Sequence, residues 1–114
     1  VLDRLVGQAG QWLKDWQLDI LESHHIHKKD APSGTALSLG RTAEAASGKP
    51  PVYHSLRGGD IVGEHTVQFT GMGERIELVH RATNRDIFAR GALHAAARLD
   101  GRPPGQYRVR DLLT

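Results

Sequence analysis

Hydrophobic residues recur along the first part of this chain with a helical period and then with a period of two. In residues 1–16 the apolar side chains stand at helical spacing from the first position, at Val1, Leu2, Leu5, Val6, Ala9, Leu13 and Trp16. Residues 17–26 alternate instead, with Leu18, Ile20, Glu22 and His24 on one face and Asp19, Leu21, Ser23 and His25 on the other. The pattern predicts an opening helix and then a strand that ends near the histidines.

The later segments predict a second helix, a hairpin and a third helix. In chain order they are a helix at 35–48, a loop or edge segment at 53–59, strands at 60–70 and 74–83, and a helix at 85–99. Gly48 is a typical helix end, and the Gly-Met-Gly segment after the first of the two strands suits the loop of an antiparallel hairpin. The elements together predict an α+β fold, a mixed and largely antiparallel sheet with helices on one face.

The two strands of the predicted hairpin have apolar residues on both faces, including Val62 and Val79. A strand that is apolar on both sides has to be covered on both sides. We therefore expect helices to cover one face of the sheet and another subunit to cover the other, so an assembly is favoured over a monomer.

The opening helix begins at the first residue, without an initiator Met and without a capping residue before it. We therefore expect the chain to be a piece of a larger protein. Trp12 and Trp16 are one turn apart on this predicted helix, and we expect them to pack against the sheet or against another domain.

Composition and charge exclude several classes of function. The 114 residues suit one domain, and 39% hydrophobic and 25% charged residues are ordinary for a globular protein. A formal net charge of +2 with two Trp, two Tyr and two Phe is far from the basic stripe and stacking aromatics of a nucleic-acid binder. No apolar run or signal-peptide pattern points to a membrane. The lack of cysteine excludes disulfides and suits the cytoplasm.

Titratable residues gather in one stretch, residues 23–37, with the sequence SHHIHKKDAPSGTAL. Imidazole is the commonest zinc ligand, so His24, His25 and His27 first suggest a metal site. In an extended segment, however, His25 and His27 share one face while His24 points away, and the two lysines that follow would repel a cation. The spacing therefore argues against a metal, and a solvated polar loop is the plain alternative.

The second half of this stretch favours an anion site. Pro32 fixes its φ angle and Gly34 permits a close approach, so the chain turns into a helix whose first amides, around Gly34 and Thr35, have no acceptor within the helix. These amides suit a small carboxylate or phosphate, beside the hydroxyls of Ser33 and Thr35 and the charges of Lys28 and Lys29. The neighbouring histidines could exchange protons with that anion. The segment PSGT alone would be an ordinary helix cap.

The segment ESHHIHKKDAPSGTA at residues 22–36 resembles the E-x-H-H-x-x-K-x-D-A-P-S-G-T-A signature of the dihydrodipicolinate reductase family, whose members act in lysine biosynthesis. The resemblance continues through RGGDIVGEHTVQFTGMGERIELVHRATNRDIFARGAL and covers most of the chain, from about Leu18 to Leu99.

The resemblance implies an oxidoreductase with two domains, an N-terminal Rossmann domain for NADH or NADPH and a C-terminal domain that binds a dicarboxylate ring substrate and forms a homotetramer. Residues 1–114 resemble only the C-terminal domain. The segment GMGERI lacks the third glycine of a dinucleotide-binding loop and joins two strands. The chain alone is therefore expected to be inactive, with no cofactor-binding or metal-binding residue of its own.

The resemblance also implies roles for individual residues. His24 matches the position of a proton donor or acceptor, and Lys28 matches that of a proton donor. His25, Gly34 and Thr35 match substrate-binding positions, and Ser33 lies in the same loop, where its hydroxyl would donate to a carboxylate.

Two other functions stay open on the sequence, a histidine metal hydrolase and an assembly module without a working site. Asp30 suits either a turn or cap residue or an orienting partner of Lys28 or His27. Some polar residues are substrate neighbours, cross-strand charge pairs or interface contacts, namely Glu64, His65, Glu74, Arg75 and Glu77. Arg85 either reaches a carboxylate or is solvated. His54, His80 and His94 have no partner that the sequence indicates, and a structural or surface role is expected for each.

Overall fold

A computed structural model describes residues 1–112, and the chain divides into two compact units. The larger unit, Leu2–Thr83, contains α1 (Leu2–Trp12), β1 (Gln17–His24), α2 (Gly34–Ser47), β2 (Val52–Arg57), β3 (Gly63–Gly71) and β4 (Glu74–Ala82). The smaller unit runs from Asn84 onward, together with Val1, and contains α3 (Asp86–Leu99) and the 3-10 helix η1 (Val109–Leu112).

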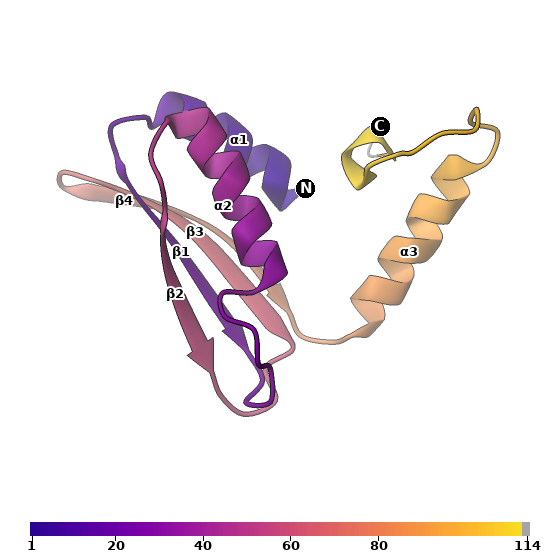
Figure 1. Cartoon of the computed structure of the whole chain (residues 1–114), viewed down its shortest axis with the longest axis horizontal. Coiled ribbons are helices and arrows are strands. Elements are labelled where there is room, and N and C mark those ends of the chain that lie inside the picture. Colours follow the sequence, from indigo (N-terminus) through magenta and orange to yellow (C-terminus); the bar gives the residue numbers. More distant parts are fainter. Residues whose placement is uncertain (113–114) are drawn as a thin grey trace. The chain divides into compact units, whose positions relative to one another are not determined.

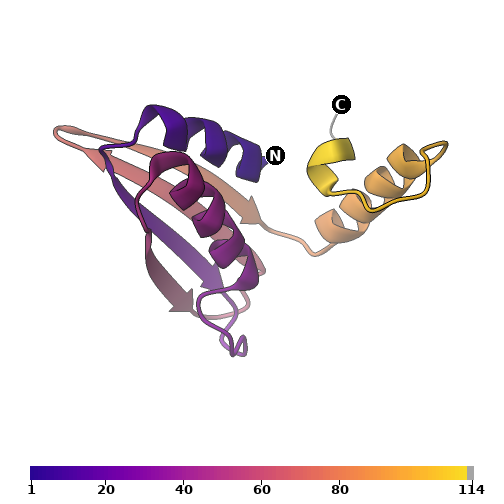
Figure 2. The ribbon, with the colours of Figure 1, turned by 45° about the horizontal axis from the view of Figure 1, so that its top comes forward.

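The four strands form one sheet in the order β2-β1-β3-β4. β1 pairs in parallel with β2, whereas the β1–β3 and β3–β4 pairs are antiparallel. Both α1 and α2 lie on the same face of this sheet (Figures 1 and 2). The predicted α+β class, with a mixed and largely antiparallel sheet and helices on one face, is thus confirmed.

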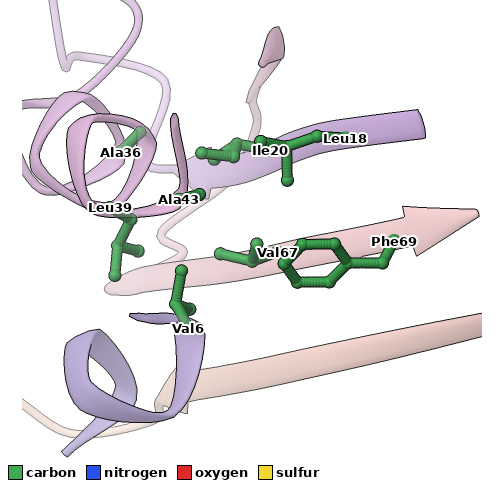
Figure 3. Close-up of a cluster of buried hydrophobic side chains, with 8 residues drawn as sticks. All are labelled: Val6, Leu18, Ile20, Ala36, Leu39, Ala43, Val67 and Phe69. Atoms are coloured by element: carbon green, nitrogen blue, oxygen red, sulfur yellow. The ribbon is translucent and has the colours of Figure 1, made fainter. Parts of the chain in front are cut away.

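The core lies between these two helices and the two central strands. Its fully or nearly fully buried members are Val6 from α1, Ala36, Leu39 and Ala43 from α2, Leu18 and Ile20 from β1, and Val67 and Phe69 from β3. Figure 3 shows the side chains of Val6 and Leu39 directed toward the strands. The alternation in the sequence explains this arrangement, because every second residue of β1 and β3 faces the helices.

Two glycines allow the helices to approach their neighbours. A Cβ atom on Gly40 of α2 would lie 1.9 Å from the hydroxyl oxygen of Tyr53 on β2, and one on Gly10 of α1 would lie 2.8 Å from Cβ of Ala46 on α2. Because any larger residue would push these elements apart, the two glycines set how closely the helix layer lies on the sheet.

The first helix is shorter than the sequence predicts. α1 ends at Trp12, and a turn closed by a hydrogen bond from the Trp16 amide to the Leu13 carbonyl leads into β1. The prediction that both tryptophans lie on one helix is therefore wrong. Trp16 packs against the core and covers Gly71, whereas Trp12 is 78% exposed.

The smaller unit contains the predicted C-terminal helix. α3 spans Asp86–Leu99, and none of its residues is buried. Arg98 donates a hydrogen bond to the carbonyl of Leu112, which holds η1 against α3. Along residues 1–112, no helix combines the length and the apolar character that crossing a membrane requires.

Candidate anion-binding and proton-transfer site

The ionisable residues of the predicted site gather where three strands meet the first turn of α2. The parallel strands β1 and β2 both end here, at His24 and Arg57, which are register partners. The antiparallel strand β3 begins here, at Gly63. The loop of residues 25–33 leads from the end of β1 to the start of α2 (Figure 1). Side chains from three strands and one loop therefore reach the same region.

Glu22 is the buried centre of this region, and its side chain has no exposed surface. Its two carboxylate oxygens accept hydrogen bonds from the two terminal nitrogens of Arg57 at 2.8 and 2.9 Å. Oε2 also accepts from Nδ1 of His24 at 2.5 Å, and Oε1 accepts from the backbone N–H of Ser33 at 3.2 Å. One carboxylate thus joins β1, β2 and the start of α2.

Opposing effects act on the pKa of Glu22. Burial, the largest single effect, raises the pKa because the charged form loses its water. Hydrogen bonds from Arg57, Ser55 and His24 and the positive charge of Arg57 together outweigh it, and the pKa falls from 4.5 to about 2. Glu22 is therefore ionised at neutral pH, and its charge is compensated by Arg57.

His24 is oriented by its hydrogen bond to Glu22. Because a carboxylate only accepts hydrogen bonds, Nδ1 of His24 carries the shared proton. Nε2 has no hydrogen-bond partner within residues 1–112. It faces Gly63, where a Cβ atom would lie only 3.3 Å away. The nitrogen that can exchange a proton with a ligand is thus Nε2.

His65 of β3 belongs to the same region. Its Nε2 shares a hydrogen bond of 2.9 Å with the hydroxyl of Ser33, and its ring meets the ring of His24 edge to face, with centroids 5.1 Å apart. Burial lowers the pKa of His65 from 6.5 to about 4, and the charge of His24 adds to this effect. His65 is therefore neutral at pH 7.

Lys28 lies in a loop whose backbone carbonyls accept hydrogen bonds from the side chain of Arg57. Nε of Arg57 donates to the carbonyl of Lys28 at 3.2 Å, and a terminal nitrogen donates to the carbonyl of Asp30 at 2.6 Å. Nζ of Lys28 lies 3.0 Å from a carboxylate oxygen of Asp30, and this hydrogen bond lowers the pKa of Asp30. Asp30 is thus the partner of Lys28, one of the two roles that the sequence left open.

The first turn of α2 presents free backbone donors. Ser33 is the N-cap residue, and its hydroxyl oxygen accepts from the backbone N–H of Ala36 at 3.1 Å. The amides of Gly34 and Thr35, both exposed residues, have no acceptor in the described part of the chain. An anion at this position would meet two N–H groups and the positive end of the helix dipole.

The structure brings most of the predicted residues together. His24 and Ser33 are joined through Glu22, and Gly34 and Thr35 follow Ser33 directly. His25 instead lies beside His27, with ring centroids 6.4 Å apart, and its Nδ1 accepts from the backbone N–H of His27 at 3.2 Å.

Sequence reasoning missed Glu22 and Arg57 as site residues and left the role of His65 open. A carboxylate two residues before a histidine on one strand face is a readable signal for Glu22. Arg57 had no such signal, because its place depends on the pairing of β2 with β1. His54, which had no partner in the sequence, lies 2.8 Å from Asp19 on the opposite face of the sheet.

In residues 1–112 no group of three or more His, Cys, Asp or Glu side chains is placed to hold a metal ion. A surface hollow of about 670 Å³ at the other end of β1 and β3 shares no residue with the region around Glu22. It is lined by Asp15, Trp16, Gln17, Leu18, Lys49, Pro50, Val52, Thr70, Gly71 and Met72.

The fold and the site define a two-layer α+β domain that offers backbone amides to an anion beside ionisable side chains, which is the chemistry of a small-molecule-binding domain. A family model described as "Dihydrodipicolinate reductase, C-terminus" matches residues 1–113. The chain belongs to this family, and the resemblance stated from residues 22–36 is confirmed.

Curated relatives agree with the family match. The chain is 72% identical over 113 residues to the 4-hydroxy-tetrahydrodipicolinate reductase of Xanthomonas axonopodis pv. citri (strain 306), and also 72% identical to that of Stenotrophomonas maltophilia (strain K279a). Each comparison covers 99% of this chain and 47% of the relative. The chain thus spans about half the length of these relatives.

A solved structure has the same fold. It is described as dipicolinate-bound dihydrodipicolinate reductase from Paenisporosarcina sp. TG-14 and matches with a TM-score of 0.79 at 22% sequence identity. The match covers 98% of this chain and 51% of that one.

Proposed function

We propose that residues 1–114 form the substrate-binding and tetramer-forming C-terminal domain of a reductase that uses NADH or NADPH. Its substrate is the hydroxylated or dehydrated ring that precedes tetrahydrodipicolinate in diaminopimelate and lysine biosynthesis. Support comes from the names of the relatives and from the dipicolinate bound by the similar solved protein. The cytoplasm, which the lack of cysteine suits, is the proposed compartment.

One observation of the structure carries the proposal. The free amides of Gly34 and Thr35 adjoin Ser33, which the buried Glu22 ties to the oriented ring of His24. A dicarboxylate needs hydrogen-bond donors and positive charge, and its reduction needs a proton source nearby. Both requirements are met where β1 ends and α2 begins.

The proposed roles follow from this geometry. Gly34 and Thr35 bind one carboxylate, and His25 and Lys28 lie in the preceding loop to meet the rest of the ring. The Ser33 hydroxyl already has hydrogen-bond partners in the Ala36 amide and His65, and the residue is 2% exposed, so we assign it the role of holding the helix end in place.

Reduction requires a hydride and a proton. A hydroxylated substrate first has to lose water to give a conjugated ring. A reduced nicotinamide, which a separate domain would hold, would supply the hydride to that ring, and the product of this addition would be an enamine. Lys28 can protonate the enamine carbon and pair with a carboxylate, and Nε2 of His24 can donate or accept a proton. Without a nicotinamide site, the 114-residue chain binds ligand but does not reduce it.

Calorimetric titration of the 114-residue chain with pyridine-2,6-dicarboxylate tests the proposal. We expect binding that weakens as salt is added, because charged groups hold the anion. Lys28→Ala removes one positive charge, and Thr35→Val removes the side-chain hydroxyl, a further donor that we propose beside the two backbone amides. Each variant should weaken binding by about tenfold or more. Lys29→Ala is the matched control, since Lys29 is exposed and adjacent.

The alternatives predict other results. Stoichiometric zinc in the purified protein would favour a metal hydrolase. A folded assembly that gives no heat with the dicarboxylate would favour an assembly module. Equal affinities of the Lys28→Ala and Lys29→Ala variants would rule out the proposed site.

A further inference from the structure

We infer that Glu22 and Arg57 are positioning residues of this site, a deeper reading that rests on the proposed function. Glu22 holds His24 with its proton on Nδ1, so that Nε2 faces the ligand. Arg57 binds the same carboxylate and also the loop that contains Lys28, and so joins the two. One buried ion pair thereby sets the places of both proposed proton-transfer groups.

The contacts of His24 carry the first half of this inference. Nδ1 lies 2.5 Å from Oε2 of Glu22. The side chain of Glu22 is fully buried, so it cannot turn toward solvent. The ring edge rests against His65, which limits rotation about the side-chain bonds. Gly63 leaves the space beside Nε2 open, because a Cβ atom there would lie 3.3 Å from it.

The contacts of Arg57 carry the second half. Its guanidinium donates two hydrogen bonds to Glu22 and two more to the loop carbonyls of Lys28 and Asp30. The planar fork of arginine can span a carboxylate and neighbouring carbonyl groups at once, which a lysine ammonium cannot do. Arg57 therefore connects the fixed end of β1 to a loop that lacks regular structure.

Burial explains why this pair is suited to positioning. The side chain of Glu22 is fully buried and that of Arg57 is 17% exposed, so neither group can exchange its partner for water at low cost. His24 also meets the ring of His65 on β3 edge to face, and its register partner on β2 is Arg57, whose guanidinium binds the same carboxylate. Neither supplies a negative charge, so Glu22 alone can accept the Nδ1 proton.

The same strand provides a matched control. Asp19 lies on the opposite face of β1, is 7% exposed, and contacts Nε2 of His54 at 2.8 Å. It is a second carboxylate–histidine pair, away from the proposed site, in which the carboxylate is buried and the His54 side chain is 50% exposed. A loss of general stability would affect variants of both pairs, whereas a positioning effect on His24 belongs to Glu22 only.

Long-range ¹H–¹⁵N NMR of the 114-residue chain reads the protonated nitrogen directly. At a pH where the ring is neutral, we expect His24 as the Nδ1–H tautomer in the unsubstituted chain. Glu22→Gln should make the Nε2–H tautomer appear, because an amide can donate as well as accept. Asp19→Asn should leave the His24 signals unchanged and alter those of His54.

Arg57→Lys tests the loop. It keeps the charge but not the fork, so backbone amides of residues 25–33 should exchange with solvent at least tenfold faster, while His24 keeps its tautomer. Pyridine-2,6-dicarboxylate should bind at least tenfold more weakly to this variant. Unchanged amide exchange in folded Arg57→Lys would overturn the role of Arg57.

The tautomer measurement on the unsubstituted chain keeps the inference testable even if Glu22→Gln fails to fold. Finding His24 as the Nε2–H form there would overturn the role of Glu22, as would an unchanged tautomer in folded Glu22→Gln. Failure of the proposed function has a different signature, which is a folded chain with the Nδ1–H tautomer that does not bind the dicarboxylate.

Discussion

At the scale of single residues, the charge states of the site depend on what surrounds each group. Glu22 is buried, yet it stays ionised because Arg57, Ser55 and His24 all donate hydrogen bonds to it. His65 is buried without a carboxylate partner, so the same loss of water keeps it neutral. Glu22, which has hydrogen-bond donors, is therefore charged, whereas His65, which has no carboxylate partner, is neutral in the same buried region.

We expect the free energy of unfolding to fall in two steps as pH decreases. Both residues have a lower pKa in the folded chain, so the unfolded chain binds protons first and each group contributes stability that acid removes. The contribution of His65 is complete above pH 6.5 and is lost toward about pH 4; that of Glu22 is complete above pH 4.5 and is lost toward about pH 2. Each step is on the order of 3 kcal/mol.

Urea unfolding at a series of pH values measures both steps. His65→Gln should flatten the curve between pH 6.5 and 4 and leave the lower step intact. Glu22→Gln should remove the lower step. A flat profile for the unsubstituted chain between pH 6.5 and 4 would contradict the assignment of His65 as a buried neutral group.

At the scale of elements, the contact of Gly40 on α2 with Tyr53 on β2 sets how closely this helix lies on the sheet. Residues of β2 and β1 are paired in parallel, and α2 connects the two strands across the face of the sheet. Gly40 lets the helix lie against Tyr53. The helix N-terminus is thereby held beside the ends of both strands.

Gly40→Ala is expected to destabilise the fold by about 1–3 kcal/mol, the usual cost of overpacking. The added Cβ atom would lie 1.9 Å from the hydroxyl oxygen of Tyr53, which has to move. Tyr53→Ala in the same chain should recover part of the loss. Gly91→Ala in α3 is the control, because nothing lies within 4 Å of its added Cβ atom and alanine favours helix. Equal unfolding free energies for the two single variants would contradict this account.

At the scale of the whole molecule, the larger unit has one covered and one uncovered sheet face. The helices cover one face (Figure 2). On the other, Leu21, Leu56 and Val79 are 37%, 54% and 38% exposed. Apolar residues on an open sheet face favour association, which supports the proposed homotetramer.

Val79→Asp should shift the assembly toward smaller species. Association through the sheet face that bears Val79 would bury the new carboxylate without a partner. Light scattering coupled to size exclusion measures this mass. Met72→Asp, at the 99% exposed tip of the β3–β4 hairpin, should leave the mass unchanged. A measured mass equal to that of one chain for the unsubstituted protein would overturn the proposed tetramer.

Local patterns were enough to predict most elements. The alternation of β1 placed Glu22 and His24 on the face of Leu18 and Ile20, and the structure confirms this placement. The hairpin, α2 with its end at Gly48, and α3 are also confirmed. The end of α1 was predicted wrongly, since Trp16 continues the helical spacing although the backbone has already turned.

The sequence by itself determined most of the elements, the family signature and the turn that we propose to bind an anion, because these depend on residues close together in the chain. Only the tertiary structure decided that Arg57 meets Glu22, 35 residues earlier, and that His65 meets Ser33, 32 residues earlier. The physical reason is that these contacts require strand pairing and register. Hydrophobic periodicity shows which face a side chain takes, but it does not show which strand will lie beside it.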